Sequence, residues 1–338
     1  MSNKIKITVG VTTYNRPAFL KEAVNSVLSQ SFSNFELIIS NDYQKRKVSF
    51  RSLGLKKDPR IKIVNQQENL GEIDNLNYIL KIAKSNWFIW LADDDLIHPD
   101  FLLTAEKEIL KNKDYKIAAF FSNYLASNIK RHCFLPICRE KNTVFLDFLS
   151  FLRGYSSKKI SLIGVYGVMN TDCLRRCGGI LKLGNSFSPY SDTLLPIYLA
   201  RQGIILWLDE PLVLLRTHPE SLSYNSSNIT AYVSAEIDFL KHLNSLMFRV
   251  CRSQKNKIVA NFIQWFSINQ WSVLEKDNKI SCIEKIKKFL QIQFEFNFPR
   301  LIFKFKLKLL LFLLIFLLKK MMLNFFVFLK KCIINNKL

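Results

Sequence analysis

The sequence is poor in glycine, and its glycines do not form a known phosphate-binding motif. Only 10 of its 338 residues are glycine. Neither the G-x-G-x-x-G fingerprint of dinucleotide-binding folds nor the P-loop of nucleoside triphosphatases occurs in it. The usual glycine-rich cradles for phosphate groups are therefore excluded.

The sequence also lacks a disulfide framework, a zinc motif and a secretory signal. Its seven cysteines are scattered at positions 133, 138, 173, 177, 251, 282 and 332. The first four, with His132, have x4 and x3 spacings instead of paired C-x2-C, so we expect buried thiols and not a zinc site. The first residues, MSNKIKITVGVTTYN, show only a short, interrupted apolar run. We therefore expect no signal peptide and a cytoplasmic protein with reduced thiols.

The sequence contains far fewer acidic than basic residues. The chain has 27 Asp and Glu against 49 Lys and Arg, a net charge of +22. Such a balance favours an anionic partner: nucleic acid, an anionic membrane surface or a phosphate-rich substrate. Residues 279–338 hold 13 Lys or Arg and 2 Asp or Glu, an excess of 11 positive charges. These charges lie among Leu, Phe and Ile, and no nucleic-acid-binding motif is visible, so we expect no nucleic-acid partner.

The segment 300–338 is apolar as well as basic. Leu309–Leu318 is uninterrupted, Lys319 and Lys320 end it, and Met321–Leu329 continues it. A spanning helix needs about 20 apolar residues, and two central lysines cost about 5–7 kcal/mol. We therefore expect an interfacial helix, peripheral on the anionic inner face of the cell membrane. A transmembrane span and a helix that packs within the protein or forms a homo-oligomer are the alternatives.

The first 95 residues alternate between strand and helix patterns. Apolar runs typical of strands occur at Ile5–Thr12, Glu36–Ser40, Ile61–Val64 and Trp87–Leu91. An amphipathic helix is predicted after Pro17 and another over Ile73–Ala83. This order predicts an α/β fold with a Rossmann-like, mostly parallel sheet flanked by helices. Ligands of such sheets bind beyond the carboxyl ends of the strands, where Thr12–Pro17, Asn41–Gln44 and Ala92–Asp95 are expected to converge.

The remainder of the chain is less regular. From about residue 100 to 225, loops alternate with strands such as Ile204–Leu208 and Leu212–Leu215, and beyond about residue 228 the pattern is helical. A chain of this length accommodates one large domain with an appendage, or two domains.

Three consecutive aspartates, Asp93, Asp94 and Asp95, follow the Trp87–Leu91 run. Adjacent carboxylates repel one another unless a cation neutralises them or water screens them. One interpretation is a solvated turn before a helix that starts near Pro99 and Asp100. The other is a site for Mg²⁺ or Mn²⁺, which bind carboxylates together with substrate phosphates.

The order and spacing of these segments resemble the family 2 glycosyltransferases of the GT-A fold. The resemblance covers roughly residues 5–220 and rests on T-Y-N, S-x-L-x-Q-x-F, E-L-I-I, N-x-G and D-x-D before proline. It implies inverting, metal-dependent transfer of a sugar, typically from a UDP-sugar, to a hydroxyl of a saccharide or lipid-linked saccharide in cell-surface polysaccharide synthesis. A polyprenyl phosphate acceptor, or an inactive protein that binds sugar nucleotides or glycans, is the alternative.

The resemblance also implies roles for individual residues. Those expected to contact the nucleotide-diphosphate donor are Thr12, Thr13, Tyr14, Asn15, Asp42, Asp93, Asp94 and Arg216. Asp94, Asp95 and His218 would bind Mn²⁺ or Mg²⁺; a D-x-D pattern favours Asp93 and Asp95 instead, whereas counting back from Pro99 favours Asp94. Asp42 would contact the base, and Arg216 and His218 belong to an R-x-H-x-x-S-L-S segment.

Asp192 is the general base that the resemblance implies, taking a proton from the acceptor hydroxyl. The alternative is that Ser191 and Asp192 cap a helix. The sequence departs from the family pattern at Leu76, where Arg is common, at Ser191, where an acidic residue is common, and after Asp42, where a glycine turn is missing. The resemblance divides the chain into a catalytic domain at 1–225, a helical region at 226–299 and the membrane-associating tail at 300–338.

Overall fold

The computed structural model describes residues 6–128, 142–185, 187–218 and 228–276, together with 284–285, 287–289 and 291. The chain forms two compact units, Met1–Cys251 and Arg252–Leu338. The predicted tail at 300–338, and His132, Cys133 and Cys138, lie outside the described residues. The predicted division of the chain at 225 and 299 stays a prediction.

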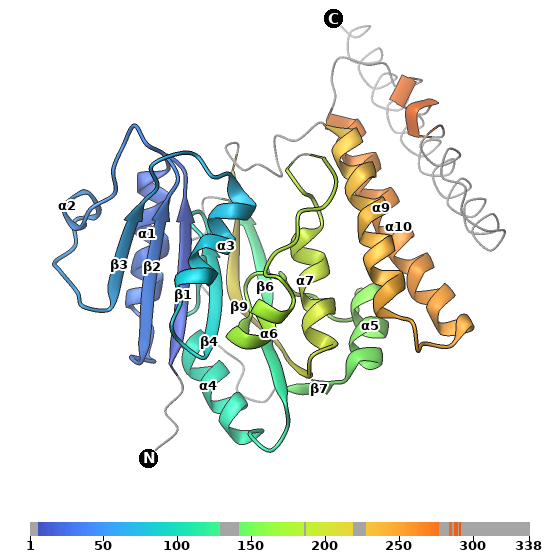
Figure 1. Ribbon diagram of the computed structural model, residues 1–338, viewed down its shortest axis with the longest axis horizontal. Helices are drawn as coiled ribbons and strands as arrows, with labels where there is room; N and C mark the ends of the chain where they lie inside the picture. The colour runs from blue at the N-terminus through green and yellow to red at the C-terminus, as the bar shows by residue number, and fades with distance from the viewer. Residues whose placement is uncertain are drawn as a thin grey trace, which may run out of the picture. The chain divides into compact units, whose positions relative to one another are not determined.

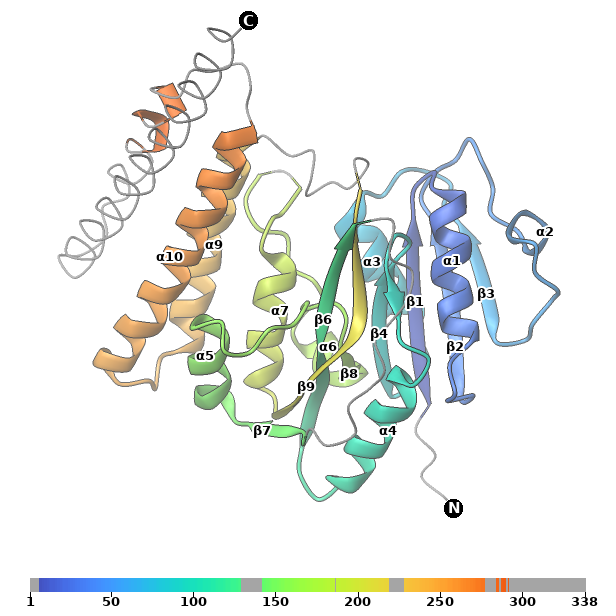
Figure 2. The ribbon, with the colours of Figure 1, turned by 180° about the vertical axis from the view of Figure 1, so that it is seen from behind.

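The first unit is built on one mixed sheet, with strands in the order β3-β2-β1-β4-β8-β6-β9-β5 and β7 beside β9 (Figures 1 and 2). The strands are β1 Ile7–Thr13, β2 Phe35–Asn41, β3 Ile61–Asn65, β4 Trp87–Ala92, β5 Leu96–Ile97, β6 Ile117–Asn128, β7 Val144–Leu146, β8 Val168–Asn170 and β9 Ile204–Thr217. Strands β1 to β4 pair in parallel, as do β6 and β9, whereas β8 is antiparallel to both β4 and β6. The predicted mixed, mostly parallel sheet is confirmed.

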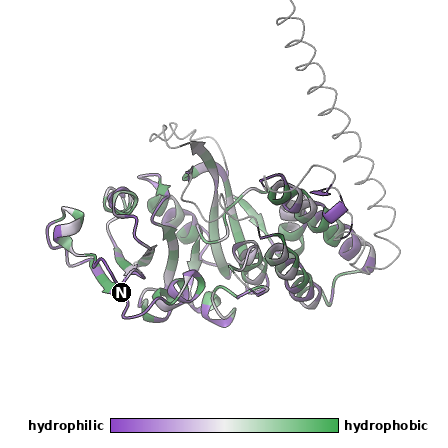
Figure 3. Ribbon diagram, turned by 90° about the horizontal axis from the view of Figure 1, so that it is seen from above, coloured by the Kyte–Doolittle hydropathy of each residue, from purple (hydrophilic) through white to green (hydrophobic). Residues whose placement is uncertain are grey.

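Helices cover both faces of this sheet. They are α1 Pro17–Leu28, α2 Phe50–Leu53, α3 Glu72–Ile82, α4 Phe101–Lys111, α5 Phe148–Ser156, α6 Thr171–Arg176, α7 Ser191–Ala200 and α9 Ile229–Leu246. Helices α1 and α4 lie on the face seen in Figure 2, and α3 and α6 on the face seen in Figure 1. From above, the central strands are largely hydrophobic, and hydrophilic residues gather on the outer loops and helix surfaces (Figure 3).

Local sequence explains why α1 packs where it does. Pro17 occupies its first turn, where the missing N–H costs no hydrogen bond. Its buried residues recur at helical spacing, as Leu20, Ala23, Val24 and Val27. They join alternate residues of β1, β2 and β4 in one apolar cluster, so α1 is fixed against this face of the sheet.

On the opposite face, α3 approaches the sheet closely at Gly10. A Cβ there would lie 2.7 Å from Ile79 Cγ2 and 3.0 Å from Phe88 Cζ, which is too close for a side chain. Trp90 Nε1 donates a 2.9 Å hydrogen bond to the Leu76 carbonyl and ties the same helix to β4. The first turn of α3 is thereby fixed beside the carboxyl ends of β1 and β4.

Two strands predicted separately, Ile204–Leu208 and Leu212–Leu215, are parts of the single strand β9. Its pairing with β6 shifts register opposite Asn123, next to Pro211. Proline cannot donate a ladder hydrogen bond and is common at such irregularities. The strand then continues to Thr217 and delivers the R-x-H segment to the sheet edge.

The second unit contains α10, Arg252–Lys276, whose buried residues include Ile258, Phe262 and Phe266. Among the residues that the structure describes, no helix has the length and apolar character needed to cross a membrane.

Candidate active site

The predicted polar segments converge at the carboxyl ends of β1, β2 and β4. In the parallel register, Thr13 lies beside Asn41, and Thr12 lies beside Ala92. Residues that follow these strands therefore share one edge of the sheet, as the sequence predicts.

A short antiparallel pairing brings the end of β9 to the same edge. Strand β5 begins directly after Asp95, and its residue Leu96 pairs with Leu214 of β9. Continuing that register places Arg216 opposite Asp94. Arg216 and His218 therefore reach the aspartates although more than 120 residues separate them along the chain.

Asp93 is fully buried and faces β1 and α1. Its Oδ2 accepts a 2.5 Å hydrogen bond from Thr13 Oγ1, and its Oδ1 lies 2.9 Å from Arg16 Nη2. Burial raises the pKa of Asp93 to about 6, although Arg16 and the Thr13 hydroxyl favour the charged form.

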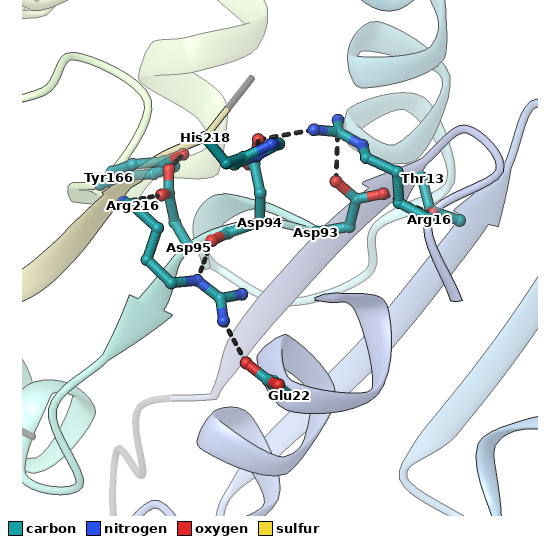
Figure 4. Close-up of polar contacts among 9 residues, drawn as sticks. All are labelled: Thr13, Arg16, Glu22, Asp93, Asp94, Asp95, Tyr166, Arg216 and His218. Atoms are coloured by element: carbon teal, nitrogen blue, oxygen red, sulfur yellow. Dashed lines mark hydrogen bonds and ion pairs between the residues drawn. The ribbon is translucent and has the colours of Figure 1, made fainter. Parts of the chain in front are cut away.

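Asp94 is the most accessible carboxylate of the three, with 13% of its side chain exposed. Its Oδ2 receives two contacts, from Arg16 Nη1 at 2.6 Å and from His218 Nε2 at 2.9 Å (Figure 4). Its main-chain carbonyl accepts a hydrogen bond from Arg216 Nε. Asp94 thus joins the residues after β1 to the end of β9.

Asp95 points toward a different set of partners. It is 2% exposed; its Oδ1 accepts the Arg216 N–H at 2.8 Å, and its Oδ2 accepts a hydrogen bond from the Tyr166 hydroxyl. Burial, followed by the neighbouring charge of Asp94, raises the pKa of Asp95 to about 7. The structure therefore brings Asp94 and His218 together but directs Asp95 to Tyr166 and the β9 backbone (Figure 4).

The solvated-turn interpretation of the triple aspartate is wrong. Asp93 and Asp95 are buried, and a short strand separates the cluster from helix α4. The residue at the start of α4 is Asp100, whose Oδ1 accepts a 2.7 Å hydrogen bond from Ser31 Oγ. The Arg16 guanidinium pairs with Asp93 and Asp94, and the charge of the Arg216 guanidinium favours the ionised form of Asp95.

Residues of helix α1 hold the guanidinium group of Arg216. Arg216 is 3% exposed, lies 5.0 Å above the Phe19 ring and pairs with Glu22 through Nη1. His218 stacks on the same ring with a 4.4 Å centroid distance and a 27° interplanar angle. Among the described residues, Arg216 Nη2 and His218 Nδ1 find no hydrogen-bond partner. The aromatic ring therefore orients both side chains that β9 supplies.

The residues predicted to line a nucleotide pocket lie beside this cluster. Tyr14 is 49% exposed and makes an edge-on contact with Tyr43, with ring centroids 5.1 Å apart. Asn15 adopts a left-handed conformation (φ 56°), which asparagine tolerates better than most residues. It turns the chain from β1 into α1 and leaves the two tyrosines at the open edge.

Asp42 also lies at this edge, and its carboxylate is already engaged. Its two oxygens accept the backbone N–H groups of Leu70 and Gly71, each at 2.9 Å. Gly71 has φ 82° and precedes α3, so the N-x-G motif forms a turn that Asp42 anchors. Asp42 therefore fixes the start of α3, in addition to any contact that it makes with a ligand.

Asp192 is the second residue of α7 and is partly exposed. The residue before the helix is Tyr190, in a left-handed conformation, so Ser191 and Asp192 lie inside the helix and not at its cap. Dense surrounding protein raises the pKa of Asp192, while the Thr193 N–H at 2.8 Å favours its ionised form. These effects suit a carboxylate that acts as a base near neutral pH.

Glu72 connects Asp192 to the aspartate cluster. Desolvation raises the pKa of this first residue of α3, and the charges of Asp192 and Asp94 raise it further, whereas Arg16 opposes the shift. Asp192 and Asp94 thus both influence the carboxylate of Glu72, at the start of α3.

Two small structural features fix the backbone of Asp192. Pro196 lies four residues later, so the Asp192 carbonyl lacks the N–H that normally closes a helical turn. Gly164 packs against that carbonyl, and a Cβ at position 164 would overlap it and approach Pro196 Cδ to 2.9 Å. The position of Asp192 therefore depends on a glycine in the loop before β8.

A divalent cation fits this site as an ion shared with a substrate. Asp94 Oδ2 and His218 Nε2 are 2.9 Å apart, so one ion can contact both. In the part of the chain that the structure describes, no three His, Cys, Asp or Glu side chains are arranged to hold an ion alone. Mg²⁺ and Mn²⁺ commonly combine one or two carboxylates with phosphate oxygens and water. Two protein ligands therefore suit an ion that binds together with a diphosphate.

Several residues of this site were not predicted from the sequence, among them Arg16, Glu72 and Tyr166. Arg16 was visible in the Thr12–Pro17 segment, and its position before the helix-opening proline was an available signal. Glu72 directly follows the N-x-G motif, whereas Tyr166 carries no sequence signal, because only the fold brings it to Asp95.

The buried aspartates predict an unusual dependence of stability on pH. With its pKa raised to about 6 from 3.8, Asp93 holds its proton more tightly in the folded protein than in the unfolded chain. Its favourable contribution is complete below about pH 4 and is lost as the pH rises through about 6. We expect the wild type to lose stability relative to Asp93→Asn over this range, measured by urea unfolding at several pH values. A constant difference between the two proteins would contradict the assignment.

Comparisons with known proteins agree with this geometry. Residues 8–161 match the model of glycosyl transferase family 2. An uncharacterized glycosyltransferase of Rickettsia typhi is 25% identical over 271 residues, covering 78% of this chain and 80% of that protein. One of Rickettsia conorii is 29% identical over 156 residues, covering 44% of this chain but only 25% of the relative's length.

Solved structures show the same fold. S. aureus TarS 1–349 in complex with UDP-GlcNAc has a TM-score of 0.59 at 17% identity, covering 85% of this chain and 81% of that one. The mannosyltransferase PcManGT from Pyrobaculum calidifontis, in complex with GDP-Man and Mn²⁺, has a TM-score of 0.50 at 15% identity, covering 90% and 84%. The match to the family 2 glycosyltransferases therefore covers residues 8–161, and the fold is the GT-A fold of these solved structures.

Proposed function

We propose that the protein transfers a sugar from a nucleotide-diphosphate sugar, UDP-linked, to a hydroxyl of a saccharide or lipid-linked saccharide, with inversion at the anomeric carbon. One observation carries this proposal: Asp94, His218 and Arg216 meet at one edge of the sheet, and Asp192 and Asp94 both influence the carboxylate of Glu72 at that edge. Such a site combines a group that activates an acceptor with groups that attract a diphosphate.

The nucleoside would bind at the open edge formed by Thr12–Asn15. The exposed Tyr14, in contact with Tyr43, offers an aromatic surface for a base, and Asp42 precedes Tyr43 and bonds to the 70–71 turn. A UDP donor is supported by the TarS complex with UDP-GlcNAc, and the GDP-Man complex of PcManGT is the contrasting case.

The diphosphate would lie against Asp94, His218 and the guanidinium groups. Asp94 and His218 would hold Mn²⁺ or Mg²⁺, which neutralises charge on the departing nucleoside diphosphate when bound. In this proposal Asp95, predicted as a metal ligand, instead holds the backbone of Arg216 and the hydroxyl of Tyr166. Arg216 would contribute its free Nη2 donor to a phosphate oxygen.

Asp192 would accept the proton of the acceptor hydroxyl. The hydroxyl oxygen attacks the anomeric carbon from the side opposite the diphosphate, and the bond from that carbon to the diphosphate oxygen breaks. Inversion follows from this in-line geometry. A raised pKa strengthens Asp192 as a base, provided that the ionised form persists at the working pH.

The pathway and the cellular location that we propose are those predicted from the sequence. We propose a role in cell-surface polysaccharide synthesis at the cytoplasmic face of the membrane, with residues 300–338 binding anionic lipid. That segment lies outside the described residues, so its composition is the support for this part of the proposal.

The direct test is transfer by the wild type and by Asp192→Asn. A panel of UDP- and GDP-sugars with Mn²⁺ and glycan acceptors would be scored for product by mass spectrometry. Loss of a general base typically costs about 100-fold or more in rate, so we expect that loss in Asp192→Asn with unchanged nucleotide affinity. Asp172→Asn, an exposed aspartate in the first turn of α6, is the matched control.

The outcomes separate the alternatives. Full activity of Asp192→Asn would favour an acceptor that is already anionic, such as a polyprenyl phosphate, over a hydroxyl. Nucleotide binding by the wild type without transfer or donor hydrolysis would contradict the enzyme proposal and favour a binding protein.

A second prediction concerns the main chain at Asp192, the proposed general base. Gly164→Ala should push the Asp192 carbonyl aside and displace its carboxylate. Misplacement by about 1 Å can cost on the order of 100-fold in rate, so we expect slow transfer with unchanged nucleotide affinity. A folded Gly164→Ala protein with normal turnover would show that the contact does not position Asp192.

A further inference from the structure

Arg16 bridges two of the three aspartates at the centre of the site. It lies between Asn15, with its left-handed backbone, and the first residue of α1. Its Nη2 is 2.9 Å from Asp93 Oδ1, and its Nη1 is 2.6 Å from Asp94 Oδ2 (Figure 4). One guanidinium therefore holds two mutually repelling carboxylates in place.

The same oxygen of Asp94 has a second partner. Asp94 Oδ2 also lies 2.9 Å from His218 Nε2. This oxygen and this nitrogen are the two protein atoms that would face a divalent cation. A cation bound there must approach the Arg16 guanidinium, and two positive groups on one carboxylate oxygen repel each other. Arg16 and a metal ion are therefore in competition for Asp94.

Of the two arginines beside the cluster, Arg16 is the more accessible. The Arg216 side chain has no exposed surface and is held by Phe19 and Glu22, whereas 21% of the Arg16 side chain is exposed. Arg16 also interacts electrostatically with Glu72 at the start of α3, so a further carboxylate stands within its range.

We propose, on the basis of the function proposed above, that Arg16 is an exchangeable counter-cation that makes metal binding depend on the nucleotide. In the donor-free protein it pairs with Asp93 and Asp94 and opposes binding of a divalent cation. When a nucleoside diphosphate binds, the guanidinium transfers its ion pairs to the phosphate oxygens, for which its planar fork is suited. Asp94 then becomes available to the metal.

Arg16 is thus a positioning residue that couples two ligands. Because coupling free energies are reciprocal, the diphosphate must strengthen metal binding by the same factor by which the metal strengthens diphosphate binding. A site without this competition would bind the metal comparably with and without nucleotide.

The test measures Mn²⁺ binding to the full-length protein by the electron paramagnetic resonance signal of free Mn²⁺, with and without UDP. For the wild type we expect weak binding alone and at least about tenfold tighter binding with UDP, within the usual range of such couplings. Arg16→Gln should bind Mn²⁺ alone about tenfold more tightly than the wild type, and UDP should then add little.

Three further variants make the result specific. Arg60→Gln removes the same charge from the Asp58 ion pair at the start of β3 and should leave Mn²⁺ affinity unchanged. Arg16→Lys keeps the positive charge but lacks the planar guanidinium, so it should give an intermediate Mn²⁺ affinity. This variant tests the proposal even if Arg16→Gln does not fold. The gain should vanish in the double variant Arg16→Gln with Asp94→Asn.

Equal or weaker Mn²⁺ binding by folded Arg16→Gln would overturn the proposal, because a merely structural role for Arg16 predicts that result. If the wild type nevertheless binds UDP and transfers sugar, the proposed function stands without it. Failure of the wild type to bind UDP would count against the proposed function, while the metal-only comparison of Arg16→Gln with the wild type would still decide the competition.

Discussion

The site depends on neutralising three neighbouring carboxylates at the end of one buried strand. Charges this close together and this poorly hydrated are unfavourable unless cations accompany them. The protein supplies those cations from both sides, with Arg16 after β1 and Arg216 near the end of β9. Burial also raises the pKa of Asp93 and of Asp95, so both carboxyls bind a proton more tightly than an ordinary aspartate does.

The topology of the sheet brings the positively charged side chains to the aspartates. Parallel pairing of β1 with β4 brings Arg16 to the aspartates, and the short pairing of β5 with β9 brings Arg216 and His218. Phe19, from α1, contacts the side chains of both Arg216 and His218, so one helix supports the two side chains at the end of β9. The exchange of cations that we propose for Arg16 involves a side chain and not the strands of the sheet.

Much of this architecture could be predicted from the sequence because its causes are local. Alternating apolar runs specified the strands, and the rule for parallel sheets placed Tyr14, Asp42 and the aspartates on one edge. The hydrogen-bond partners of these residues could not be predicted, because contacts such as that between Asp95 and Tyr166 join residues that are far apart in the sequence. Charge repulsion among the aspartates indicates that positive charge must lie nearby, but it does not indicate that Arg16 of the same chain provides part of that charge.

The most direct measurement is thermal unfolding of the wild type with a panel of nucleotide sugars, with and without Mn²⁺. A ligand that binds only the folded state raises its apparent stability by mass action. We expect a specific UDP-sugar to raise the melting temperature strongly when Mn²⁺ is present and only slightly when Mn²⁺ is absent. No shift with any nucleotide sugar, or the same shift without Mn²⁺, would contradict a site in which the aspartates serve a shared metal and diphosphate.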